Sequence, residues 1–312
     1  VQFLSTCSGI EFKQPDELSC ASVKEMPDTV GTCSCDKKSG KCTLSVTLEF
    51  GHVVIPANST GLKGELHMLG FNVPGSPGRS PGPTLRVRAG DTLKVLLKNN
   101  MPPELVSTAS ETKNGYHDFS VVNMHTHGLH VSPLAPGDEV VNTRVQPGKT
   151  HPYIYNIPDD HMGGTHWYHP HWHGAVSIHV NFGAAGMIIV EDAVNQLPAE
   201  LNDLDEYIVA TFHVDYDNIA SITKGYINNC KKLHDGTQSC HDVEKCSNVV
   251  GGEACQKCAD PLCEAQAEPF NDTKSPKSEL LLVNGQHQPT LNITAGTWVR
   301  LRLGSMASRD YL

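Results

Sequence analysis

An internal repeat is the feature that most constrains the fold of this 312-residue chain. Residues 83–97 return as residues 289–303, with a constant offset of 206 (289 minus 83). Both copies begin with Pro-Thr-Leu and contain an Ala-Gly pair, at Gly90 and Gly296, between two runs of alternating apolar residues. This pattern predicts a strand, a turn and a second strand, forming a hairpin with the same buried face in each copy. The chain is therefore expected to contain two copies of one β domain, the second cut short.

Period-2 alternation of apolar and polar residues dominates the rest of the sequence. Leu44, Val46, Leu48 and Phe50 share one face of a run whose other face is polar. Similar runs occur at 85–88, 93–97, 121–127, 153–157, 186–190 and 207–214. Many short strands separated by Gly and Pro turns indicate an all-β fold of Greek-key β-sandwich domains.

The domain organisation follows from the repeat and from shifts in composition. Residues 1–43 are expected to form a cysteine-containing extension, and residues 44–192 a complete first domain. A linker at 193–204 leads into a partial second domain at 205–312. The polar segment 228–272 holds six cysteines and is expected to be an insertion in a surface loop.

The charge balance bears on the class of partner. The chain has 24 Lys and Arg against 34 Asp and Glu, and its formal net charge is -10. It has no basic run, which argues against binding of nucleic acid or an anionic membrane. No stretch approaches the roughly 20 apolar residues of a membrane-spanning helix, so none is expected. The expected partner is a small molecule.

The cysteines indicate the redox environment. They lie in two groups, Cys7, Cys20, Cys33, Cys35, Cys42 and Cys230, Cys240, Cys246, Cys255, Cys258, Cys263. Together with sequons at Asn58, Asn271 and Asn292, they favour disulfides in a secreted, glycosylated protein. The spacing does not reveal the pairing, and the Cys255–Cys258 pair is also compatible with zinc. The odd count and the start at Val1 suggest a processed chain or a fragment.

Two His-x-His groups are the strongest chemical signal. His125 and His127 form one group, and His169 and His171 form the other. In a strand, residues i and i+2 project from the same face about 7 Å apart. Two such strands side by side would direct four neutral imidazoles into one volume, a donor set suited to copper or zinc. The alternative is a set of surface histidines without a metal. Residues 44–192 contain no cysteine, so a thiolate-ligated copper centre is not expected there.

These residues carry a resemblance to a known family. Residues 82–91, 125–128, 164–171 and 186–192 resemble, in order and approximate spacing, the first cupredoxin domain of the laccase-like multicopper oxidases. Residues 282–285, with the repeated segment, resemble the start of that family's second domain. The resemblance covers roughly three quarters of the chain. Residues 1–42 and the cysteine-rich segment lie outside it.

The resemblance implies a site and a reaction. His125 would bind the type 2 copper, while His127, His169 and His171 would bind the type 3 pair of a three-copper cluster. That cluster would couple one-electron oxidation of a phenol, an amine or a metal ion to the reduction of dioxygen to water. An acidic residue after the first His-x-His group assists proton delivery in the family, and Asp138 holds that position. Capping of its own turn explains an aspartate after glycine equally well.

The sequence also departs from the family. The HCHxxxH motif, which belongs to a terminal cupredoxin domain and to the type 1 copper site, does not occur. We therefore expect the natural protein to continue beyond Leu312, and the chain alone to be incomplete for turnover. A non-catalytic copper-binding module and an imidazole-ligated zinc hydrolase are the alternative functions.

The remaining histidines receive simpler interpretations. His130, His166 and His173 are expected to have packing or solvent roles, and Trp167 and Tyr168 to pack beneath the site.

Overall fold

Strands are the main regular secondary structure in the residues that the structure describes. The computed structural model describes residues 10–55, 66–76, 78–101, 118–194, 196–215 and 279–306. Its helical elements are α2 (Val176–Asn181) and the short 3-10 turns η1 (Ser22–Glu25) and η3 (Ala199–Leu201). The expected all-β fold is confirmed. None of the described helices has the length and apolar character needed to cross a membrane.

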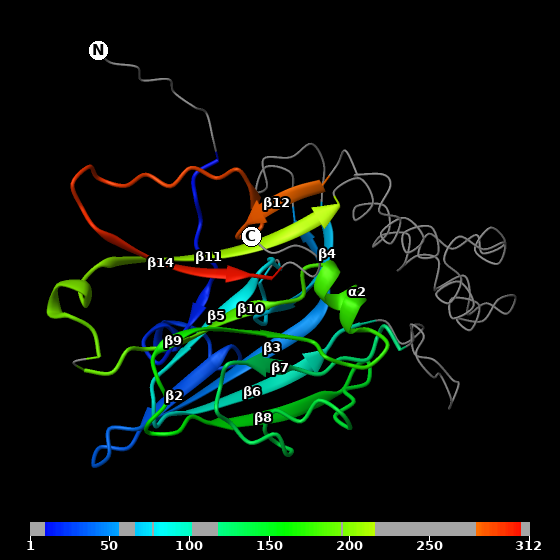
Figure 1. Cartoon of the computed structure of the whole chain (residues 1–312). Coiled ribbons are helices and arrows are strands. Elements are labelled where there is room, and N and C mark those ends of the chain that lie inside the picture. Colours follow the sequence, from blue (N-terminus) through cyan, green and yellow to red (C-terminus); the bar gives the residue numbers. More distant parts are fainter. Residues whose placement is uncertain are drawn as a thin grey trace, which may run out of the picture.

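Two five-stranded sheets form the larger part of the molecule. The first contains, in spatial order, β1 (Glu17–Leu18), β5 (Gly82–Val87), β10 (Gly186–Val190), β9 (Gly164–His169) and β7 (His125–His127). The second contains β2 (Gly31–Cys35), β3 (Cys42–Ile55), β6 (Thr92–Asn99) and β8 (Thr150–Asn156), with β4 (Leu66–Asn72) paired to β3. Figure 1 shows these sheets as two layers of the molecule.

The core lies between these two sheets. The alternating face of β3 that the sequence predicted is buried, from Leu44 to Phe50, and so are Leu93 and Leu97 of β6. The rings of Phe71 on β4 and Tyr168 on β9 meet edge to face, with centroids 5.2 Å apart. Because these rings come from opposite sheets, their contact closes the sandwich.

A third sheet follows the linker. It contains β13 (Gln286–His287), β12 (Glu279–Val283), β11 (Asp205–Asp215) and β14 (Val299–Ser305), in that order. It lies beside the first sheet (Figure 1), and ion pairs join the two. Glu206 on β11 accepts hydrogen bonds from Arg86 on β5, at 2.8 Å, and from Arg302 on β14, at 2.5 Å. Arg302 also contacts Asp192 at 3.0 Å.

The repeat forms a different structure from the predicted hairpins. Gly90 has a φ of +84°, and Gly296 has the same value, so the predicted turn occurs in both copies. In the first copy, however, β5 and β6 belong to different sheets, because the turn carries the chain across the sandwich. In the second copy, residues 291–294 form no strand. The hairpin prediction was therefore wrong, and the first copy is a corner between two sheets.

Some expectations fall on other parts of the chain. The cysteine-rich segment 228–272 and the sequons at Asn58 and Asn271 lie outside the described residues. Asn292 is exposed. In the N-terminal segment the structure pairs Cys20 with Cys33 and Cys35 with Cys42. Disulfides were expected, although their pairing was not readable from the sequence.

Candidate metal centre

Strand pairing brings the two His-x-His segments together. β7 is antiparallel to β9 at the edge of the first sheet, with His125 opposite His169 and His127 opposite Trp167. Side chains directly opposite each other on an antiparallel pair project from the same face, about 5 Å apart. His171 follows two residues after the end of β9. The register thus places three histidines on one face and the fourth just beyond it.

The four imidazole rings form one compact group. The ring centroid of His125 lies 4.7 Å from that of His127, 5.6 Å from that of His169 and 5.0 Å from that of His171. His127 and His169 are 5.0 Å apart, and His169 and His171 are 5.7 Å apart. The structure therefore brings together all four histidines that the sequence singled out.

Two of these rings direct nitrogen atoms at each other. Nε2 of His127 lies 2.9 Å from Nε2 of His169. Nδ1 of His169 lies 2.6 Å from the Pro170 carbonyl oxygen, so Nδ1–H donates there and Nε2 keeps its lone pair. Burial lowers the pKa of His169 to about 3, and desolvation also lowers the pKa of His127. Both rings are therefore neutral near pH 7, the form in which imidazole binds a metal.

Asp138 fixes the orientation of His125. Its Oδ2 lies 2.8 Å from Nδ1 of His125, and its Oδ1 accepts the Thr126 backbone N–H at 2.9 Å. A carboxylate on Nδ1 holds the proton at that nitrogen and leaves Nε2 as a free donor. The sequence singled out Asp138 for proton delivery, and turn capping was the alternative. Its side chain contacts His125 and Thr126 on β7, so it holds the His125 ring in place, while proton delivery stays a prediction.

Asn123 is a residue that the sequence analysis missed. It is fully buried, its Oδ1 accepts the His171 backbone N–H at 2.6 Å, and its Nδ2 donates to the Val140 carbonyl at 3.1 Å. It thus links the segment before β7 to the segment after β9. The available signal was an amide residue inside the apolar run that precedes His125.

Trp167 flanks the site on the same face of β9. Its ring stacks on His127, with centroids 4.3 Å apart and planes at 22°, and on His169, at 4.6 Å and 24°. Tyr168 points to the opposite face, into the core, where its hydroxyl donates to the Pro83 carbonyl at 2.8 Å. Both residues were expected to pack beneath the site. Trp167 packs against two of its rings, whereas Tyr168 lies in the core on the other face of β9.

A second histidine group lies away from these four rings. The His161 ring centroid is 4.9 Å from that of His130 and 5.4 Å from that of His166. Both nitrogens of His161 are occupied, since Nε2 accepts the His130 backbone N–H and Nδ1 lies 2.8 Å from the Met162 carbonyl oxygen. His166 and His169 are three residues apart on β9, so they project from opposite faces.

The donor set suits a soft or borderline transition metal. Imidazole nitrogens bind such ions at about 2.0 to 2.1 Å, so one ion would fit against both His127 and His169 across their 2.9 Å separation. Asp138 contacts Nδ1 of His125, so Nε2 of that ring remains available to bind a metal. Calcium and magnesium prefer oxygen ligands, and these rings offer none.

Comparisons with known proteins find similarity to multicopper oxidases. A sequence profile described as multicopper oxidase matches residues 111–195. A putative multicopper oxidase of Saccharomyces cerevisiae is 29% identical over 53% of this chain and 24% of that protein. A multicopper oxidase of Staphylococcus aureus is 25% identical over 72% of this chain and 39% of that protein. The crystal structure of a multicopper oxidase from Pseudomonas thermotolerans is 20% identical, covers 85% of this chain and 47% of its own, and gives a TM-score of 0.49.

The chain thus spans about a quarter to two fifths of the length of these two curated relatives. The matched profile contains all four clustered histidines, Asp138 and Trp167. The sequence matches show that this chain is similar to multicopper oxidases over part of its length, including the segment that contains the clustered histidines.

Proposed function

We propose that this chain is the copper-binding first part of an oxidase that couples one-electron oxidation of a phenol, an amine or a metal ion to reduction of dioxygen to water. The observation that carries the proposal is the convergence of four imidazole rings from β7, β9 and the segment just after β9. In this proposal His125 binds a type 2 copper, and His127, His169 and His171 bind the type 3 pair. Copper ions in such a cluster supply the electrons that dioxygen takes up.

The protein's own contribution is to hold the rings in one geometry. The register between β7 and β9 fixes the separation of the two segments, and Asn123 fixes the backbone at His171. Trp167 covers one side of His127 and His169 and limits the rotation of both rings. Rings restrained before a metal binds lose less entropy on binding.

Asp138 has two roles in this proposal. It keeps the Nδ1 proton on His125, so that Nε2 is the atom free for copper. The same carboxylate is the nearby acid or base through which protons reach the site. Replacement of Asp138 by Asn keeps the shape of the side chain and removes its charge. We expect slower oxygen reduction in the complete enzyme, and copper binding weakened by at most about 10- to 100-fold.

We also propose that the complete enzyme is secreted and that a C-terminal cupredoxin domain supplies the remaining ligands and the type 1 copper. The two disulfides in the N-terminal segment support an oxidising compartment.

Copper binding tests the proposal directly. The purified chain is titrated with copper, and bound metal is measured by elemental analysis and electron paramagnetic resonance. We expect the His127→Ala and His169→Ala variants to bind less copper than the unaltered chain, because each removes a ring from the pair that faces across 2.9 Å.

His166→Ala is the matched control, since it removes a histidine from the opposite face of the same strand. It should bind as much copper as the unaltered chain. Equal copper binding by all four proteins would falsify the assignment of the site.

A further inference from the structure

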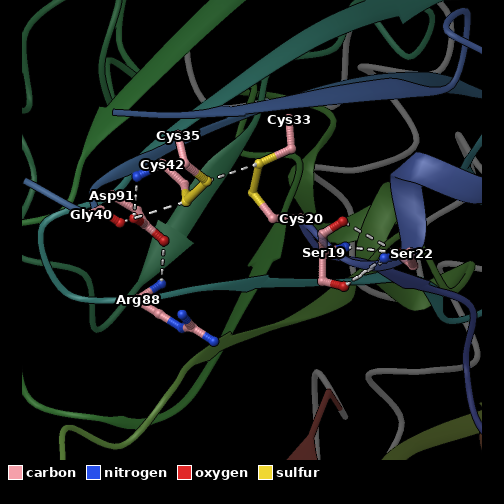
Figure 2. The surroundings of a disulfide bond; sticks show 9 residues. All are labelled: Ser19, Cys20, Ser22, Cys33, Cys35, Gly40, Cys42, Arg88 and Asp91. Carbon is pink, nitrogen blue, oxygen red and sulfur yellow. Dashed lines mark hydrogen bonds between the residues drawn. A yellow bond between two sulfur atoms is a disulfide. The ribbon is translucent and has the colours of Figure 1, made fainter. Parts of the chain in front are cut away.

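Four cysteine sulfurs gather at the edge of the second sheet, away from the histidines. Cys20 follows β1, Cys33 and Cys35 lie on one face of β2, and Cys42 begins β3. Figure 2 shows the disulfides Cys20–Cys33 and Cys35–Cys42 side by side. All four Sγ atoms lie within 4.8 Å of one another, and Cys33 Sγ is 3.9 Å from Cys35 Sγ.

This arrangement is close to the geometry of a tetrathiolate metal site. Zinc binds thiolate sulfur at about 2.3 Å in a tetrahedron, so neighbouring sulfurs in such a site are about 3.8 Å apart. The Cys33 to Cys35 separation already has this value, and no pair of sulfurs exceeds it by more than about 1 Å. Reduction would break the two disulfide bonds and let the sulfurs of each pair move apart to the same distance.

The backbone that carries the sulfurs is held by contacts independent of the disulfides. Cys35 and Cys42 are opposite each other in the β2–β3 ladder. The Cys42 backbone N–H donates to Asp91 Oδ1 at 2.7 Å. Beside Cys20, the Ser19 backbone N–H donates to Ser22 Oγ at 2.9 Å, and the Ser22 N–H donates to Ser19 Oγ at 3.1 Å. The four positions are therefore fixed by ladder, aspartate and serine contacts that reduction leaves in place.

The surroundings also suit a bound cation with four thiolates. Cys20, Cys33 and Cys42 are half-buried, while Cys35 is exposed, so reagents and metal ions can reach the cluster from solvent. Four thiolates around Zn²⁺ carry a net charge of two negative. The turn between β2 and β3 carries Lys37 and Lys38 beside Asp36, and Lys41, which forms an ion pair with Asp159.

We propose that, when reduced, Cys20, Cys33, Cys35 and Cys42 bind one Zn²⁺ as a tetrathiolate, as the alternative to their two disulfides. Two molecules of a dithiol reductant transfer four electrons and four protons to the two disulfides and are themselves oxidised to two disulfides. Zn²⁺ then binds the four sulfurs, and the four thiol protons are released to solvent. The metal would hold β1 against the β2–β3 pair in a reducing environment, as the disulfides do in an oxidising one.

Protection from alkylation tests this in the unaltered full chain. The chain is reduced anaerobically with a phosphine, incubated with or without Zn²⁺ and treated with iodoacetamide, and each cysteine is followed by peptide mass mapping. We expect Zn²⁺ to slow alkylation of all four cysteines by about tenfold or more, because a metal-bound thiolate is a poor nucleophile. Equal rates with and without Zn²⁺ at these four positions would overturn the proposal.

A cobalt titration provides the variant test. Reduced chain with Co²⁺ should show the thiolate-to-cobalt charge-transfer bands of a tetrahedral site. The Cys33→Ser/Cys35→Ser variant should lose one equivalent of this signal, and Ser34→Ala, between the two on the other face of β2, should keep it. An unchanged signal in the double variant contradicts the site. The proposal is independent of copper binding, since it uses none of the four clustered histidines.

Discussion

The two copies of the repeat share a glycine turn and the strand after it, and these strands differ in burial. In each, a strand pairs in parallel with one neighbour, β6 with β3 and β14 with β11. In each, that neighbour pairs antiparallel with the next strand, β4 or β12. Yet Val95 and Leu97 of β6 are 1% and 0% exposed, while their counterparts Leu301 and Leu303 of β14 are 47% and 65% exposed.

The difference comes from what lies against each strand. The apolar face of β6 packs against the first sheet, whereas no described residues cover the corresponding face of β14. The opposite face of β14 is the one in contact, because Arg302 is buried against Asp192 and Glu206. Its counterpart Leu96 is exposed in the first copy. An alternating sequence therefore specifies a strand with two unlike faces, and its neighbours decide which face is buried.

The largest expected effect comes from the matched pair Leu97 and Leu303. Leu97→Ala leaves a cavity between two sheets and should lower the free energy of unfolding by about 2 to 5 kcal/mol. Leu303→Ala removes a side chain that is mostly in water, so we expect a change within about 0.5 kcal/mol. Urea unfolding of both variants measures the difference. Equal losses at the two positions would show that the face of β14 is covered in solution.

A second prediction concerns how the stability of the first copy's domain depends on pH. His179 on α2, in the first copy's domain, is fully buried, and desolvation lowers its pKa to about 4. The unfolded chain binds this proton near pH 6.5, so stability should fall as the pH drops from 6.5 towards 4, by up to about 3 kcal/mol. His179→Gln does not titrate, so its unfolding free energy should depend less on pH across this window. Identical pH profiles for the two proteins contradict the buried neutral ring.

The smallest predicted change in stability concerns the glycine turn that both copies share. Gly90 and Gly296 both have a φ of +84°, a conformation that costs a residue with a side chain about 1 kcal/mol or more. A Cβ at Gly296 meets no atom within 4 Å, while one at Gly90 approaches Asp159 and Lys41, whose side chains are exposed. We expect Gly296→Ala to cost about 1 kcal/mol and Gly90→Ala the same or slightly more, measured by thermal unfolding. A neutral result at Gly296 would mean that the turn is not shared.

Much of the site was predictable because its chemistry is local. A His-x-His strand places both rings on one face whatever surrounds it, and this holds for His125 and His127 on β7. In the second group only His169 lies on a strand, so the spacing identified His171 as a candidate but did not predict its local structure. The contacts of Asn123 and the pairing of Asp138 with His125 could not be predicted, since they join residues 13 to 48 positions apart. The cysteine pairing was unreadable for the same reason.

The sequence by itself determined most of the strands of the first domain, the two glycine turns and the four candidate ligands, because backbone preference and alternation act over a few residues. Only the tertiary structure decided that the first copy of the repeat crosses between sheets, which face of β14 is buried, and that four sulfurs meet beside β2. The physical reason is the same in each case. Burial and side-chain contact depend on which distant segments pack together, and a local pattern carries no information about that choice.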